Sequence, residues 1–193
     1  MKTESTNTAA PPPSTRELIL DAAEDLFATQ GYTATTIKEV AAQVGVQGPA
    51  LYKHFANKRA LFEEVLARLF SPFTELIADG DDLQEEQMNM VRQHLANPNA
   101  SRIVQHATLS GGEDLALLVE RWYVPFFQQA QAGLDKDQKA SGAVAIMAFH
   151  SMLLGYLTLA PLHREIFDID PLSEESIREL LELEGSMARA LIS

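Results

Sequence analysis

The sequence predicts an all-α protein, because three features of the chain indicate helices along its whole length. Apolar residues recur three and four positions apart, which is the spacing of one face of a helix. Ser/Thr-x-x-Glu capping boxes at Ser14 and Thr36 mark two helix starts. No segment alternates apolar and polar residues, and no Val/Ile/Thr-rich run is bounded by turns as a strand would be. We expect about nine helices.

The first 60 residues predict three short helices after a flexible tail over residues 1–13. The first helix begins at the Ser14 capping box and ends at Gly31, and its apolar face is formed by Ile19, Ala22, Ala23, Leu26 and Phe27. The second runs from Thr36 to Gly45 and carries Ile37, Val40, Ala41 and Val44. The third has Pro49 in its first turn and an apolar edge of Leu51 and Phe55. Residues 14–60 are therefore expected to form one small domain.

Residues 61–193 are expected to form a second, larger helical domain. A long helix from Asn57 would join the two domains and should kink or end at Pro72. Further helices are predicted near residues 83–96, 101–109, 113–132, 137–159 and 173–192. Segments rich in Asn, Gly and Pro separate them, the last from Pro161 to Pro171.

Composition excludes several classes of chemistry. The chain has 193 residues and no cysteine, so disulfides, thiolate catalysis and zinc–cysteine sites are ruled out. The formal net charge is −12, but it is unevenly distributed. Residues 1–60 hold six cations and six anions, and the remainder holds nine cations and 21 anions. Residues 36–60 hold four cations and one anion, so a positively charged segment lies within an acidic protein.

Residues 143–160 form an uncharged run of membrane-spanning length. His150, Ser151 and Thr158 inside the run, and the lack of a second span, argue against a membrane helix. A helix that is apolar nearly all round is more typical of a subunit interface. The last helix adds an apolar stripe of Ile177, Leu180, Leu181, Ala188 and Leu191. We therefore expect a homodimer through the helices near 137–159 and 173–192, and no membrane association.

The positive segment, residues 36–59, predicts two short helices joined by a tight turn at Gly45. Such a pair has the shape of a helix-turn-helix unit that reaches into a DNA groove. The exposed edge of its second helix would carry Gln47, Lys53 and His54.

An ordered series of motifs in this region resembles the TetR family of bacterial transcriptional regulators. The series comprises the ILDAA…LF helix, Gly31-Tyr32, Thr35-Thr36-Ile37, the Ala41…Gly45-Val46 turn, Leu51-Tyr52…His54-Phe55 and Asn57-Lys58. It covers about the first third of the chain. The resemblance implies an all-α homodimer with an N-terminal DNA-binding domain and a C-terminal domain that binds an effector and dimerises. It also implies a cytoplasmic location and no resident cofactor or metal.

The resemblance assigns two groups of DNA-contacting positions. Thr36, Tyr52, His54 and Lys58 match positions that contact phosphates. Gln47, Gly48, Pro49, Ala50 and Lys53 match positions that face base edges. Lys donates well to guanine, Gln pairs with adenine, and Pro or Ala can meet a thymine methyl. Gly48 and Ala50 depart from relatives that carry polar side chains there, so DNA shape is expected to add to the readout.

For the effector, the sequence offers large or soft side chains on helices but no fingerprint. The candidates are Met88, His94, His106, Trp122, Tyr123, Phe126, Phe127, Met147 and His150. A mainly apolar pocket with a few polar groups is how small-molecule sites are built. Each of these residues could equally be ordinary core. The expected effector is an apolar or amphipathic organic molecule.

The favoured hypothesis is a repressor that such a ligand releases from a palindromic operator. A regulator of the same fold that its ligand activates is the alternative. An enzyme is disfavoured because no metal-binding His spacing, Gly-rich phosphate loop or nucleophile elbow is present. A nonspecific DNA-binding protein is disfavoured by the acidic C-terminal part.

Overall fold

The structure is a computed structural model that describes residues 12–76, 83–130 and 139–192. Within these ranges every regular element is a helix. The helices are α1 (Thr15–Ala34), α2 (Ile37–Val44), α3 (Gly48–Leu51), α4 (Lys58–Leu76), α5 (Leu83–Ala96), α6 (Pro98–Ser110), α7 (Glu113–Leu118), the π-helical η1 (Val119–Tyr123), α8 (Val124–Ala130), α9 (Lys139–Phe167) and α10 (Glu174–Ile192). Because α7, η1 and α8 follow one another without a break, the described residues form nine helices. The all-α prediction is confirmed.

The local signals at the first helices are confirmed. In both capping boxes the Ser14 or Thr36 side chain accepts from the N3 backbone, and Glu17 or Glu39 accepts from the cap backbone. Gly31 has a φ of 81° and kinks α1 three residues before its end. Gly45 ends α2 in the left-handed conformation, which glycine adopts at little steric cost.

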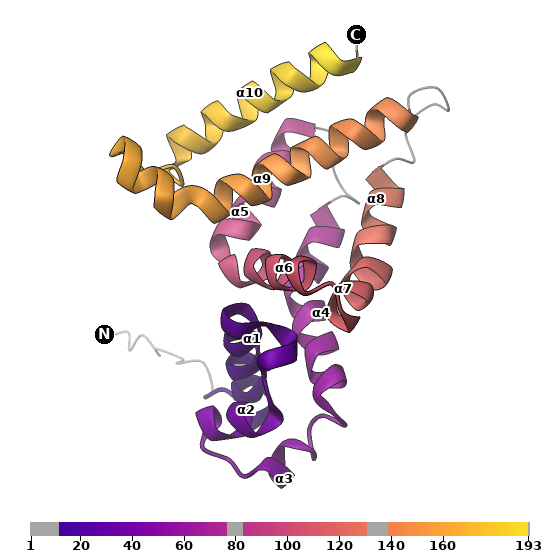
Figure 1. Cartoon of the computed structure of the whole chain (residues 1–193), viewed down its shortest axis with the longest axis vertical. Helices are drawn as coiled ribbons and strands as arrows, with labels where there is room; N and C mark the ends of the chain where they lie inside the picture. The colour runs from indigo at the N-terminus through magenta and orange to yellow at the C-terminus, as the bar shows by residue number, and fades with distance from the viewer. Residues whose placement is uncertain (1–11, 77–82, 131–138, 193) are drawn as a thin grey trace, which may run out of the picture.

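The two ends of the molecule differ (Figure 1). Helices α1, α2 and α3 gather at the lower end, and α4 leads away from them. Helix α6 lies across the molecule just above α1. Helices α9 and α10 lie across the opposite end. We call α1–α3 the head.

Two hydrophobic cores hold these helices. The larger core joins the head to α4, α6 and α7, and its fully buried side chains include Ile19, Phe27, Leu51, Phe62, Ile103 and Leu118. The smaller core joins α5, α9 and α10 through Val91, Leu153, Ile177 and Leu181. The larger core extends across residue 60, so the division into domains 14–60 and 61–193 stays a prediction.

Prolines lie inside two of the described helices, and one of these helices ends later than expected. Pro72 lies inside α4, which continues to Leu76. Pro161 lies inside α9, which continues to Phe167 instead of ending near residue 159. A proline removes one backbone hydrogen bond and kinks a helix, but the following turn can still bond to earlier carbonyls. The tail over residues 1–11 and the turn expected at residues 133–136 lie outside the described residues.

The uncharged run, residues 143–160, lies within α9. Among the described residues, no helix combines the length and the apolar character that a membrane crossing requires.

Candidate nucleic-acid interface and effector pocket

The second helix of the predicted motif is held by two apolar anchors. Backbone bonds from His54 N to Leu51 O (2.9 Å) and from Phe55 N to Leu51 O (3.1 Å) extend the helical turn beyond α3. The side chains of Leu51 and Phe55 are buried in the larger core. We call residues 47–54 the recognition turn. Its inner edge is fixed to the head, which leaves the outer edge free.

The outer edge carries the side chains that the sequence assigned to DNA contacts. Gln47, Pro49, Tyr52, Lys53 and His54 are exposed. Gly48 and Ala50 are half-buried. The Tyr52 side chain is 56% exposed although it is large and aromatic, so it is not part of the core. The structure thus brings these seven positions together on one turn of chain.

The two remaining DNA candidates already have partners within the head. Thr36 is exposed, and its hydroxyl donates to Glu39 Oε2 at 2.8 Å. Lys58 Nζ donates to the Thr33 carbonyl at 3.3 Å and lies 4.3 Å from the centre of the Tyr32 ring. Burial lowers the pKa of Lys58, opposed by the nearby charges of Asp114 and Glu39. Lys58 therefore ties the start of α4 to the end of α1.

Ion pairs decide which cations remain available to phosphates. Arg59 Nε pairs with Glu63 at 3.1 Å, and Arg121 approaches the same carboxylate at 3.6 Å. Within the described ranges, Lys38 and Lys53 form no ion pair and are exposed. Lys38 was not among the expected contacts. Its position in the first turn of α2, two residues after Thr36, was the signal that could have indicated it.

Four of the effector candidates come together between η1, α8 and α9. Tyr123 Oη lies 3.2 Å from His150 Nε2, and the rings of Tyr123 and Phe127 lie 5.3 and 5.6 Å from the His150 ring. Trp122 packs on Phe70 at 6.0 Å, and its indole nitrogen is buried without a hydrogen-bond partner in the described structure. Burial raises the pKa of Tyr123 and lowers that of His150, so both groups are neutral near pH 7. We call Trp122, Tyr123, Phe127 and His150 the aromatic cluster.

His94 belongs to the same region. Its Nδ1 lies 2.8 Å from Ser101 Oγ, and its ring lies 4.6 Å from that of Phe73. Burial, together with the charge that His150 could carry, lowers the pKa of His94 to about 4. The neutral, buried imidazole of His94 therefore adds another polar group to this largely apolar region, beside the Tyr123–His150 pair.

The other effector candidates do not join this cluster. The His106 ring lies against Gly31 of α1, where an added Cβ would be 3.2 Å from Nδ1. Met147 is 58% exposed on α9. The side chains of Met88 and Phe126 lie outside the described residues.

Comparisons with known proteins agree with this geometry. The family model for the bacterial regulatory proteins of the tetR family matches residues 19–65, which span the helix-turn-helix unit. The transcriptional repressor Rv3405c of Mycobacterium tuberculosis is 29% identical over 177 residues, which cover 90% of this chain and 87% of the relative. The repressor KstR2 of Rhodococcus jostii is 37% identical over 71 residues, about a third of each chain.

A solved structure shares the fold over nearly the whole chain. SCO4942 of Streptomyces coelicolor superposes with a TM-score of 0.63, covering 92% of this chain and 96% of that one at 18% identity. The family match lies on the helices that expose the recognition turn, and the relatives are regulators rather than enzymes. Residues 19–65 thus form an N-terminal helix-turn-helix domain of the tetR family of bacterial transcriptional regulators.

Proposed function

We propose that the protein is a dimeric repressor that binds a palindromic operator and is released by an apolar or amphipathic organic ligand. The observation that carries this proposal is the exposed recognition turn at the end of the molecule far from α9 and α10. Its Lys53 forms no ion pair with any residue that the structure describes. In the cell, such a regulator would act in the cytoplasm on the bacterial chromosome.

In this proposal the recognition turn enters the major groove. Gln47, Gly48, Pro49, Ala50 and Lys53 would face the bases, and Thr36, Tyr52 and His54 would contact phosphates. Lys58 would reach a phosphate only by leaving the Thr33 carbonyl. Lys38 is added to the phosphate contacts because it is exposed beside Thr36. Phosphate contacts fix the register, and base contacts fix the sequence.

The dimer would form through α9 and α10. The exposed apolar side chains on this surface are Leu159, Leu162, Ile166, Phe167, Leu183 and Met187. Phe167 and Leu183 line a groove of about 350 Å³ together with Tyr156, His163 and Leu180. Contiguous apolar surface of this kind on a folded protein marks an interaction site. A second copy of the same surface covers it in a symmetric dimer.

The effector would bind at the aromatic cluster. The buried Trp122 nitrogen has no hydrogen-bond partner among the described residues, and Tyr123 and His150 are neutral near pH 7. These features suit an uncharged or amphipathic molecule that carries one or two hydrogen-bonding atoms. Arg121, which is next to Trp122 in the chain, already faces Glu63 and is less available to an anionic ligand. A ligand that favours a distance between the two heads unsuited to the operator weakens operator binding. By linkage, operator DNA weakens ligand binding by the same factor.

Selection of bound duplexes from a random pool tests the DNA-binding role. We expect two inverted half-sites about one helical turn apart. A salt titration on the selected duplex and on a scrambled one then separates specific from nonspecific binding. Recovery of single half-sites, or of no preferred sequence, would contradict the proposal.

Screening of organic compounds by thermal shift, followed by operator release, tests the effector. Tyr123→Phe removes the hydroxyl that meets His150 and should weaken binding of a hit that raises the melting temperature. Arg102→Gln, on an exposed part of α6, is the matched control. Tighter operator binding on ligand addition would identify an activated regulator instead.

A further inference from the structure

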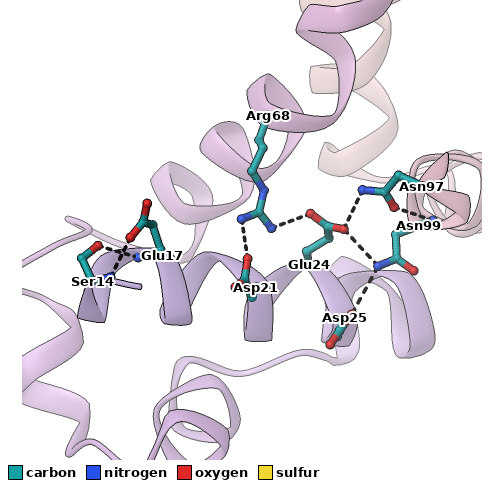
Figure 2. A network of polar contacts seen from close by, with 8 residues as sticks. All are labelled: Ser14, Glu17, Asp21, Glu24, Asp25, Arg68, Asn97 and Asn99. Carbon is teal, nitrogen blue, oxygen red and sulfur yellow. Dashed lines mark hydrogen bonds and ion pairs between the residues drawn. The ribbon is translucent and has the colours of Figure 1, made fainter. Parts of the chain in front are cut away.

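A buried carboxylate joins three helices where the head meets the rest of the molecule (Figure 2). Glu24 lies on α1, and only 7% of the residue is exposed. Its Oε2 accepts a hydrogen bond from Arg68 Nη2 of α4. Its Oε1 accepts bonds of 3.0 Å from both Asn97 Nδ2 and Asn99 Nδ2 at the start of α6. The two oxygens of one carboxylate thus bind two different helices.

Additional contacts fix each partner of this carboxylate. Arg68 Nη1 also donates to Asp21 Oδ1 at 2.6 Å, and Asn99 Nδ2 to Asp25 Oδ1 at 3.2 Å. Asn97 caps α6 by accepting from the Asn99 backbone at 3.1 Å. Burial alone would raise the pKa of Glu24, but the bonds from Asn97, Asn99 and Arg68 outweigh it and hold the pKa below its usual value. Glu24 is therefore ionised near pH 7.

Helix α6 meets α1 at a second point. Gly31 has a φ of 81°, and a Cβ there would lie 3.2 Å from His106 Nδ1. Glu24 and Gly31 are two helical turns apart, so the two contacts are separated by roughly 10 Å along α1. Two separated contacts define an angle between helices, whereas a single one leaves it free. A change in the angle between α6 and α1 must stretch the bonds at Glu24 and leave a buried oxygen unpaired.

We infer that Glu24 is a positioning residue that sets the tilt of the head against α4 and α6, and hence the distance between the two recognition turns of the dimer. This inference rests on the proposed dimeric operator binding. It goes beyond that proposal because it assigns the choice of half-site spacing to residues that touch neither DNA nor effector.

The test measures affinity for three duplexes with the full-length protein. One carries the selected half-site spacing, and the others carry it lengthened or shortened by one base pair. Glu24→Gln replaces one carboxylate oxygen with an NH2 group, so the side chain can accept from Arg68 or from Asn97 and Asn99, but no longer from both helices. Asn99→Ala removes one of the two bonds from α6 to Glu24, together with the bond to Asp25. It keeps the Asn97 cap, because that cap accepts from the backbone of residue 99.

Glu64→Gln is the matched control. Glu64 of α4 pairs with Arg16 of α1, so this variant removes one negative charge and one ion pair between the same two helices. The Glu64 side chain is 42% exposed, against 9% for Glu24, and an exposed pair constrains geometry little.

We expect wild type and Glu64→Gln to prefer the selected spacing equally. In Glu24→Gln and Asn99→Ala that preference should fall about three- to tenfold, the effect of one or two lost hydrogen bonds. If Glu24 has a purely structural role, the variants should have a lower melting temperature, or bind all three duplexes equally more weakly, with an unchanged spacing preference. That result would overturn the inference. Failure of the wild type to select paired half-sites would instead overturn the proposed function.

Discussion

At the scale of single residues, His94 links stability to pH. Its pKa falls from 6.5 to about 4 on folding, because the ring is buried and because of the charge that His150 could carry. Between these two values the unfolded chain binds a proton that the folded chain does not. The free energy of unfolding therefore decreases as the pH falls from about 6.5 to about 4.

The predicted loss from His94 across this window is about 3 kcal/mol. Urea unfolding at a series of pH values measures it. His94→Asn keeps a polar group at the Nδ1 position without titrating, so its unfolding free energy should vary much less over the same range. His54→Asn, at an exposed residue of the recognition turn, should keep the wild-type dependence. If the unfolding free energy of His94→Asn depends on pH as strongly as that of the wild type, groups other than His94 cause the dependence.

Two lysines of the head are predicted to act differently on DNA. Lys53→Ala should weaken binding to the selected operator by about 1–3 kcal/mol and have little effect on random duplexes. Lys58→Ala should weaken binding to all sequences and reduce the salt slope by about one unit. Lys58 also bonds to Thr33, so its variant needs a melting curve beside the salt titration. Equal losses on both duplexes for Lys53→Ala would remove its base-reading role.

The residue contacts that the sequence could not predict are the long-range ones. Glu24 belongs to no motif in the sequence, and its partners Arg68, Asn97 and Asn99 lie 44 to 75 positions away along the chain. Local spacing carries no information about such pairs. By contrast, the partners in each capping box are three residues apart, and the sequence predicted both.

At the scale of elements, periodicity located the helices, but the end of α9 was predicted too early. Helix α9 passes Pro161 and ends where Asp168 adopts a φ of 52°. Tyr156 Oη donates to the Pro171 carbonyl at 2.8 Å, and Arg164 bonds to Asp170 at 2.6 Å. These contacts fold the following segment back on α9 and hold its last turns. They depend on the packed structure, so proline spacing alone predicted too early an end.

The turn between α2 and α3 gives a prediction for an element. Gly45 has a φ of 75° and no heavy atom within 4 Å of an added Cβ, so Gly45→Ala meets backbone strain without a clash. We expect it to lower the free energy of unfolding by about 1 kcal/mol. Gly48→Ala, which also has open space but lies in α3, should not be destabilising. Thermal unfolding compares the two, and equal losses would contradict a conformational cause.

At the scale of the whole molecule, the surfaces of the two ends differ in chemical character. The head exposes cations, and the end formed by α9 and α10 exposes apolar side chains. The chain carries a net charge of −12, which keeps its remaining faces away from phosphates. Two copies joined through α9 and α10 about a two-fold axis that runs along the length of the molecule would point both heads the same way. Dimerisation and operator binding are then one linked equilibrium.

This linkage predicts the effect of a charge in the apolar surface. Ile166 is 59% exposed on α9, so Ile166→Glu should leave the fold intact while placing a carboxylate in the dimer contact. Leu109→Glu, at a residue 88% exposed on α6, adds the same charge outside that contact. Sedimentation should show monomers for Ile166→Glu and dimers for Leu109→Glu. Because a lone head engages one half-site, operator affinity should fall by about 10²–10⁴ only in Ile166→Glu. An undisturbed Ile166→Glu dimer would place the contact elsewhere.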